Sequence, residues 1–220
     1  MNYTKNYKRI ADEYNTKILN RYLDRLYEKE GWNFERVLDV ERQLSGIDVI
    51  FKPTNYIGKE LLVDEKAATK FLNKELNTFS FELRSENNKE KTGLLISSKS
   101  KTTHYAIIYP RSKTNKINEL DSLEWILVDK QKIIDTINKI PNFENYIEKV
   151  YDDCCENKYT RRNQFIIRMY NRTNRKNPLI LKLVWSKNIF PERPLNILFP
   201  KSELIKMSDK YIKLEFKRKK

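Results

Sequence analysis

The sequence has few of the residues on which several enzyme classes depend. Its 220 residues include one histidine, His104, two cysteines and four glycines. A metal centre built from several histidines is therefore excluded, as is any nuclease that relies on more than one histidine. A Ser-His-Asp triad would have to use His104, and no glycine-rich phosphate loop of the Walker type is present.

The two cysteines and the apolar runs exclude further classes. Cys154 and Cys155 are adjacent, so they cannot join distant segments, and they lack the paired spacing of a zinc site. We expect both to be reduced and structural. No window approaches 18 uncharged apolar residues, and the start MNYTKNYKRIADE lacks the apolar core of a signal peptide. A cytoplasmic location is the default expectation.

Positive charge is the strongest global signal. The chain carries 44 basic against 30 acidic residues, a formal net charge of +14. Such an excess favours polyanions, with nucleic acid first and anionic membrane surfaces second. A compositional bias toward lysine, asparagine and isoleucine explains why lysine outnumbers arginine, but it does not explain the excess. We therefore expect nucleic acid rather than a membrane as the partner, with DNA and RNA both left open at this point.

Hydrophobic periodicity predicts a chain of both helices and strands. Helices are expected over 6–29, 33–44, 130–140, 143–153 and 201–207. Strands are expected over 47–52, 60–67, 78–83, 93–98, 104–109, 124–128, 164–170, 179–185 and 195–199. This order favours either an α+β arrangement or a mixed α/β sheet, with a core over 1–140. Pro141 would then separate that core from a basic α+β C-terminal extension over 141–220, which can belong to the same domain.

The stretch GIDVIFKPTNYIGKELLVDEKA, residues 46–67, reads as a hairpin with unusual charges. If its turn centres on Tyr56, Asp48 and Asp64 face each other across the two strands. Directly opposed residues have Cβ atoms about 4.5–5.5 Å apart, so two carboxylates there repel. A divalent cation offsets that repulsion, and carboxylate oxygens are the ligands that Mg²⁺ takes.

Strand alternation adds a lysine to this pair of acids. Side chains at positions i and i+2 share one face of a strand, so Lys66 points the same way as Asp64. Glu65 points the other way, although its backbone carbonyl can still face the metal. The predicted result is two acids, one carbonyl and one ammonium at a sheet edge.

A third carboxylate, Glu41, is expected from the helix predicted over 33–44. Phe34, Val37 and Leu38 fall on one helical stripe together with Glu41 and Leu44. Glu41 would thus interrupt an apolar face. A buried carboxylate is costly unless it is paired or binds a metal, so we expect Glu41 to lie near the site.

Glu41, then GID, then VDEKA resemble the PD-(D/E)XK nuclease superfamily, which has the restriction-endonuclease-like fold. The resemblance covers roughly residues 33–110, about a third of the chain, and rests on a short motif. Ile47 replaces the proline of the motif's name. The resemblance implies a mixed sheet flanked by helices, with the acids on its second and third strands.

The same resemblance implies roles for individual residues. Asp48 and Asp64 would ligate Mg²⁺, for which Mn²⁺ can substitute. Glu41 would support the ion directly or through water. Lys66 would orient the attacking water and stabilise the developing charge, and the metal would lower the pKa of its bound water.

Other polar residues are candidates for auxiliary roles. In TFSFEL, Glu82 shares a strand face with Thr78 and Ser80, and it either assists the site or faces solvent. Lys101 lies in a segment that either contacts phosphate or is a solvated loop. The basic segment 158–176 supplies candidates for positioning DNA without reading its sequence: Arg161, Arg162, Arg168, Arg172 and Arg175.

Three functions remain open from the sequence. The first is a Mg²⁺-dependent nuclease that hydrolyses DNA phosphodiester bonds with a metal-activated water. The second is a non-catalytic nucleic-acid-binding protein that reuses the nuclease fold. The third is a structural or interaction protein whose charge is incidental. Cutting both strands often calls for two active sites, so a homodimer also stays open.

Overall fold

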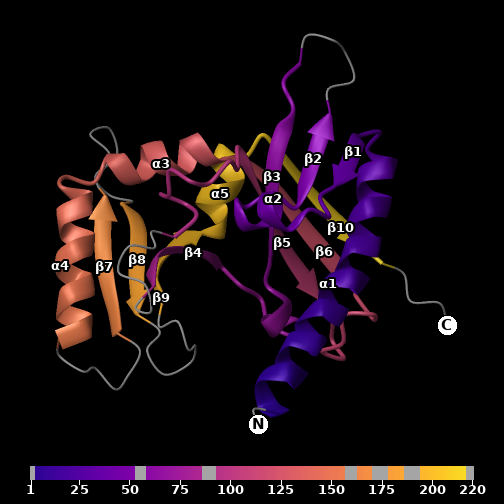
Figure 1. The fold of residues 1–220 in the computed structure, drawn as a ribbon, viewed down its shortest axis with the longest axis horizontal. Helices are drawn as coiled ribbons and strands as arrows, with labels where there is room; N and C mark the ends of the chain where they lie inside the picture. The colour runs from indigo at the N-terminus through magenta and orange to yellow at the C-terminus, as the bar shows by residue number, and fades with distance from the viewer. Residues whose placement is uncertain are drawn as a thin grey trace. The chain divides into compact units, whose positions relative to one another are not determined.

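The computed structural model describes residues 3–52, 58–85, 93–156, 163–169, 178–185 and 194–216. The chain forms two compact units (Figure 1). The first comprises Met1–Leu76, His104–Leu127 and Tyr211–Lys220, and the second comprises Asn77–Thr103 and Val128–Lys210. Each unit is built from segments that are distant in sequence, because the chain leaves the first unit and returns to it twice.

A six-stranded mixed sheet organises the first unit. Its strands, in spatial order, are β1 (Asn33–Arg36), β2 (Val49–Lys52), β3 (Leu61–Ala67), β5 (His104–Arg111), β6 (Ser122–Asp129) and β10 (Lys210–Glu215). The first three strands pair antiparallel, whereas β3 and β5 are parallel. The other elements are α1 (Tyr3–Lys29), α2 (Val40–Leu44) and the short 3-10 helix η1 (Thr69–Phe71). The α/β class predicted from the sequence is confirmed.

Helix α1 supplies one side of the core of the first unit (Figure 1). Leu19, Leu23 and Leu26 lie three and four positions apart, so they share one face and are buried. Each such side chain contributes about 1.5–3 kcal/mol when it leaves water. The helix is followed by Gly31, whose φ of 71° is the left-handed conformation that glycine adopts most easily at a helix end.

The helix predicted over 33–44 is wrong. Residues 33–36 form β1 instead, and Phe34 lies opposite Phe51 of β2. Phe34 also meets the ring of Tyr27 edge-on, with the centroids 5.2 Å apart. Strand pairing and burial of this aromatic side chain outweigh the helical spacing of the segment. Only the five-residue α2 remains helical, and none of its residues is buried.

The other predicted elements are present, with one exception. The strand predicted over 93–98 is absent, because that segment turns. Gly93 donates to the carbonyl of Leu83 at 2.8 Å, and a Cβ on Gly93 would come within 1.9 Å of the Glu82 carbonyl oxygen. The structure also contains β10, which the sequence analysis did not predict. Its side chains alternate between partly buried and exposed positions.

A four-stranded antiparallel sheet organises the second unit. Its strands, in spatial order, are β4 (Thr78–Ser85), β9 (Pro194–Pro200), β8 (Leu179–Trp185) and β7 (Asn163–Met169). Its helices are α3 (Lys130–Asn138), α4 (Phe143–Glu156) and α5 (Lys201–Met207). Helix α4 packs Tyr151 edge-on to Trp185 of β8, with the ring centroids 5.7 Å apart. Cys154 and Cys155 on this helix are both in the thiol form.

The division into units differs from the boundary predicted at Pro141. Both α3 and α4, which flank Pro141, belong to the second unit. The unit also contains β4, which precedes β5 in sequence. A boundary placed at one proline cannot describe a chain that crosses between units four times.

None of the described helices is long and apolar enough to cross a membrane.

Candidate functional site

The carboxylate pair consists of Asp48, which immediately precedes β2, and Asp64, which lies on β3. The β2–β3 register pairs Val49 with Val63 and Ile50 with Leu62. Extending that register by one position sets Asp48 opposite Asp64, as the sequence predicts for a turn centred on position 56. The turn residues themselves, 53–57, lie outside the described residues.

A compact turn delivers Asp48 to this position. Gly46 follows α2 with a φ of 81°, and the amide of Ile47 donates to the carbonyl of Arg42 at 3.1 Å. This closes the end of α2 and directs the chain into β2. The amide of Asp48 then donates to Val63 at 2.9 Å, and its Oδ2 accepts from the amide of Glu65 at 2.8 Å.

The end of β3 is open on the side of Asp48. Its pairing with β2 ends at Val63, whereas its pairing with β5 continues to Ala67. The amide of Glu65 points to the open side, because it donates to Asp48. The N–H and C=O of one strand residue point to the same side, so the Glu65 carbonyl also faces this edge. That is the orientation predicted for a metal-ligating carbonyl.

Asp64 is buried and its charge is only partly compensated. The residue is 2% exposed, and Nζ of Lys66 lies 3.0 Å from its Oδ2. Even so, no donor among the described residues makes a well-directed hydrogen bond to this Oδ2. Burial raises the pKa of Asp64 to about 7, with the nearby Asp48 carboxylate adding to the rise and Lys66 opposing it. Burial and Asp64 together raise the pKa of the neighbouring Tyr105.

These residues fit a magnesium ion held by few protein ligands. Mg²⁺ takes hard oxygen ligands, keeps several waters and is often bound by one or two carboxylates together with substrate phosphate. Asp48, Asp64 and the Glu65 carbonyl offer such oxygens. The buried Oδ2 of Asp64, which lacks a directed donor, is the observation that favours a cation. No group of three or more His, Cys, Asp or Glu side chains suited to a metal occurs among the residues described.

Glu41 does not occupy the position expected for it. It lies on α2 and is exposed, as are Leu38 and Leu44 of the proposed stripe. The buried apolar face that Glu41 was expected to interrupt does not exist, because residues 33–36 are extended and α2 buries no side chain. A contact of Glu41 with the metal, directly or through water, stays a prediction.

Comparisons with models of protein families, with curated proteins and with solved structures found no match.

The other predicted site residues are dispersed. Glu82 is exposed on β4, in the second unit rather than in the sheet that carries the carboxylate pair. Its auxiliary role stays a prediction. Lys101 and Arg168 are both exposed, and both belong to the second unit. The remaining candidates lie outside the described residues: Arg161, Arg162, Arg172 and Arg175.

Sequence analysis missed the partners of the Glu65 side chain. Its Oε1 accepts from the hydroxyl of Tyr27 at 2.5 Å, and its Oε2 accepts from Nη1 of Arg36 at 2.6 Å. We call these three residues the Glu65 network. Burial raises the pKa of Glu65, while Arg36 and Tyr27 counteract that rise. Alternation assigns Glu65 to the same buried face as Val63, and a charged side chain there should have indicated a partner.

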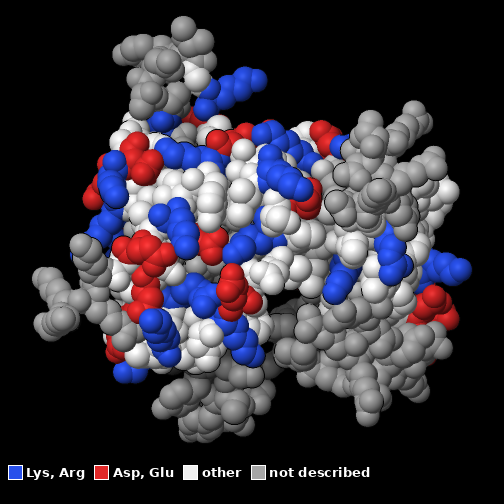
Figure 2. All heavy atoms as spheres, turned by 180° about the vertical axis from the view of Figure 1, so that it is seen from behind, with Lys and Arg blue, Asp and Glu red and all other residues white. Residues whose placement is uncertain are grey.

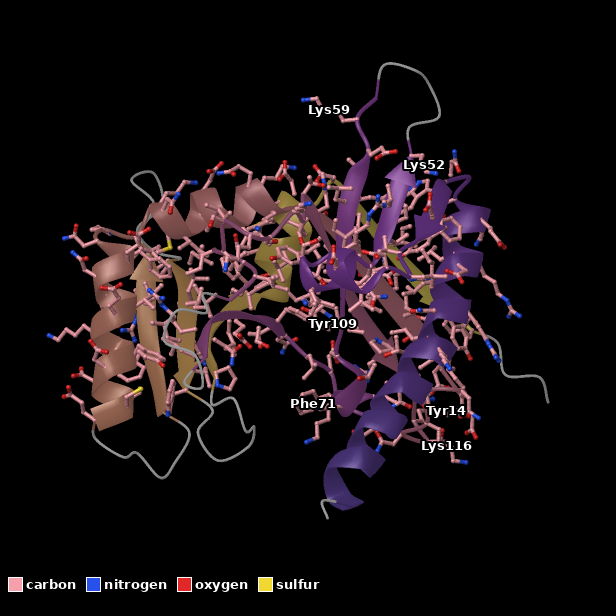
Figure 3. All side chains as sticks on the ribbon, in the orientation of Figure 1. Tyr14, Lys52, Lys59, Phe71, Tyr109 and Lys116 are labelled. Atoms are coloured by element: carbon pink, nitrogen blue, oxygen red, sulfur yellow. The ribbon has the colours of Figure 1, made fainter. Side chains whose placement is uncertain are left out.

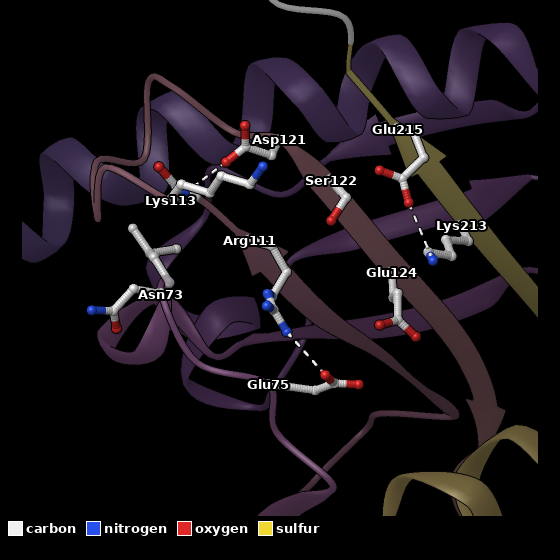
Figure 4. Close-up of a pocket in the computed structure, with 11 residues that line it drawn as sticks. Asn73, Glu75, Arg111, Lys113, Asp121, Ser122, Glu124, Lys213 and Glu215 are labelled. Atoms are coloured by element: carbon white, nitrogen blue, oxygen red, sulfur yellow. Dashed lines mark hydrogen bonds and ion pairs between the residues drawn. The ribbon is translucent and has the colours of Figure 1, made fainter.

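Two cavities lie within the first unit. One, of about 360 Å³, is lined by Asp48, Glu65 and Arg36 together with Asn20 and Gln43, so Asp48 is accessible from it. The other, of about 340 Å³, lies against β5, β6 and β10 (Figure 4).

The second cavity mixes charges of both signs. Arg111 pairs with Glu75 at 3.8 Å, and Lys213 pairs with Glu215 at 3.2 Å (Figure 4). It therefore does not present the uniform positive charge that would favour a phosphate.

Proposed function

We propose that this protein is a Mg²⁺-dependent nuclease that hydrolyses phosphodiester bonds of DNA. The observation that carries the proposal is the meeting of Asp48, Asp64 and Lys66 at the open edge of β3. A buried acid, a second acid beside it and an accessible ammonium supply the charges that phosphodiester hydrolysis needs.

The order of these residues supports the resemblance to the PD-(D/E)XK superfamily. Asp48 immediately precedes β2, and Asp64 and Lys66 lie on β3, so the acids belong to the second and third strands of a mixed sheet. This is the placement that the resemblance implies. The departure is Glu41, which is exposed on a short helix.

Each residue of the site has a distinct task in this proposal. Asp48 and Asp64 hold the ion, with the Glu65 carbonyl as a further ligand. When bound, Mg²⁺ supplies an activated water and polarises the phosphate. The Lys66 side chain is 39% exposed, so its ammonium can reach a phosphate oxygen while it remains beside Asp64. There it orients the nucleophile and stabilises the negative charge that develops in the transition state.

The charge of the molecule supports a polyanionic substrate. The formal net charge is +14, but basic and acidic side chains are interleaved over the described part of the face in Figure 2. Two lysines flank the end of the β2–β3 hairpin that is distant from Asp48 (Figure 3). Lys52 pairs with Glu35 at 2.6 Å, and Lys59 is exposed. Dispersed cations of this kind bind the DNA backbone without reading sequence.

A cleavage assay tests the proposal. Wild-type protein is incubated with supercoiled plasmid in Mg²⁺ or in EDTA, alongside the Asp64→Ala and Lys66→Ala variants. Lys74→Ala is the matched control, because Lys74 is an exposed lysine of the same unit. We expect nicking or linearisation with Mg²⁺ for wild type and control only. Salt-sensitive DNA binding without cleavage would instead support the non-catalytic binding protein. A parallel single-stranded RNA substrate separates the two nucleic acids.

A further inference from the structure

We propose that the Glu65 network (Tyr27, Arg36 and Glu65) positions the carboxylate pair for metal binding. This inference rests on the proposed function, because it assumes that the carboxylate pair holds a metal ion. The side chains of the three residues do not touch the ion or the substrate, and only the backbone carbonyl of Glu65 is a proposed ligand. They act through the backbone of β3.

The network anchors β3 to α1 and β1 through charged and polar bonds. The Glu65 side chain is 8% exposed. Its carboxylate accepts a hydrogen bond from the Tyr27 hydroxyl of α1 at 2.5 Å and one from Nη1 of Arg36 of β1 at 2.6 Å. Arg36 also donates from Nε to Asp24 at 2.7 Å. Tyr27 in turn accepts from the indole nitrogen of Trp125 at 3.3 Å. The carboxylate of Glu65 is therefore held from two directions at once.

The same residue holds Asp48 through its backbone. The amide of Glu65 donates to Oδ2 of Asp48 at 2.8 Å. Because side chains alternate along a strand, those of Asp64 and Lys66 lie on the face of β3 opposite to the Glu65 side chain. A shift of Glu65 would therefore move Asp48 through this hydrogen bond, and it would move Asp64 through the peptide that joins residues 64 and 65. Metal ligands must be held to within a fraction of an ångström, so such a shift weakens binding.

Stability alone is a poor reason for this arrangement. A buried ion pair loses the hydration of two charges, and well-packed apolar residues of similar volume are often at least as stabilising. An apolar triad at the three positions would pack among the aromatic side chains already there, such as Phe34 and Trp125. What an apolar triad lacks is a directed bond that fixes the register of β3 against α1.

This difference allows a test that separates positioning from stability. The triple variant Tyr27→Phe, Arg36→Met, Glu65→Leu replaces the network with apolar side chains of similar size. Mn²⁺ titration followed by the electron paramagnetic resonance signal of the free ion gives the dissociation constant, and thermal melting gives the stability. We expect Mn²⁺ to bind about 10–100-fold more weakly, as is common when partners of metal ligands are removed. The melting temperature should change little.

Two further variants keep the test decisive. Tyr27→Phe alone removes the hydrogen bond to Glu65 and the one from Trp125, and is expected to weaken Mn²⁺ binding about threefold or more. This variant decides the question if the triple variant does not fold. Leu23→Ala, a core change on α1 outside the network, should lower the melting temperature without changing Mn²⁺ affinity in the folded protein. Glu65→Gln, with Tyr27 and Arg36 intact, keeps one of the two acceptor oxygens and should therefore bind Mn²⁺ more tightly than the triple variant.

Each outcome identifies which claim fails. If wild-type protein binds no Mn²⁺, the proposed function fails, and the positioning role fails with it. If wild type binds Mn²⁺ and both Tyr27→Phe and the folded triple variant bind it within twofold of wild type, only the positioning role is overturned. Weaker binding in Leu23→Ala as well would mean that general loosening of the fold, rather than the network, governs the site.

Discussion

The amide of Glu65 donates a hydrogen bond of 2.8 Å to Oδ2 of Asp48, 17 positions earlier in the chain. This bond brings the entry of β2 to the end of β3 where Asp64 and Lys66 lie. It orients one carboxylate toward the open strand edge while leaving the second buried beside it. The arrangement produces an acid with a raised pKa next to an accessible lysine.

Replacing Asp64 with asparagine should stabilise the metal-free protein at high pH. The folded-state pKa of Asp64 is about 7, against an ordinary value of 3.8. Between these values the folded state retains a proton that the unfolded state has released. The free energy of unfolding therefore falls as pH rises through that window, and the loss persists above it.

Urea denaturation in EDTA measures this effect. The free energy of unfolding of Asp64→Asn should match that of wild type at about pH 4 and exceed it by about 1–3 kcal/mol at about pH 8. The reason is that one pKa unit corresponds to about 1.4 kcal/mol. Asp152→Asn, at an exposed position on α4, is the control and should change little. An Asp64→Asn variant whose stability tracks wild type at both pH values would show that the carboxyl is not destabilised by burial.

Lys66→Met should abolish cleavage without weakening metal binding. Its ammonium lies 3.0 Å from Oδ2 of Asp64, so its removal leaves the carboxylates in place and takes away a competing positive charge. We expect Mn²⁺ affinity to be equal to or slightly higher than that of wild type. Cleavage should fall about 100-fold or more, as when a charge-stabilising group is lost from an active site.

The control for this prediction is Lys74→Met, at an exposed position in the same unit. Parallel Mn²⁺ titration and plasmid cleavage should leave that variant unchanged. Loss of metal binding in Lys66→Met would argue that the lysine maintains the structure of the site. Full cleavage activity would remove it from the mechanism.

Glu41→Gln should have a small effect. Glu41 is exposed on α2, where no residue is buried, so it is at most an indirect support for the ion. We expect Mn²⁺ affinity to fall by less than about threefold, whereas Asp48→Asn should lower it by at least about tenfold. Isothermal titration calorimetry of both variants makes the comparison. A loss for Glu41→Gln as large as that for Asp48→Asn would make Glu41 a direct ligand.

Arg168→Ala and Lys101→Ala should lower the salt dependence of DNA binding. Both side chains are exposed, and removing one phosphate-binding cation reduces the slope of log K against log salt by about 0.9 for duplex DNA. Fluorescence anisotropy at several salt concentrations measures that slope. Lys206, paired with Glu203 at 2.6 Å, provides the control Lys206→Ala. Unchanged slopes in both test variants would exclude these two residues from the DNA interface.

The hairpin was the most predictable part of the site. Its register depends on the turn and on strand alternation, both of which are local. The spacing of Asp48, Asp64 and Lys66 therefore indicated their convergence. Other elements were also predictable from local sequence. The apolar runs at 179–185 and 195–199 predicted strands, the periodicity over 6–29 predicted a helix, and the structure has β8, β9 and α1 at these positions.

The failures arose where tertiary contacts decide between local alternatives. Residues 33–44 have helical spacing, but Phe34 gains more by pairing opposite Phe51 and packing on Tyr27. The Glu65 network joins residues 27, 36 and 65, and no local pattern links those positions. The division into two units also depends on long-range pairing, since β4 joins β9 rather than its neighbours in sequence.

The most direct test of the central claim is a crystal of the wild-type protein soaked in Mn²⁺, with anomalous diffraction data collected above the manganese absorption edge. We expect one anomalous peak between the carboxylates of Asp48 and Asp64, within ligand distance of both and near the Glu65 carbonyl. The same soak of Asp64→Asn crystals should give no peak there. Manganese bound elsewhere, with no density at these carboxylates in the wild-type crystal, would contradict the account.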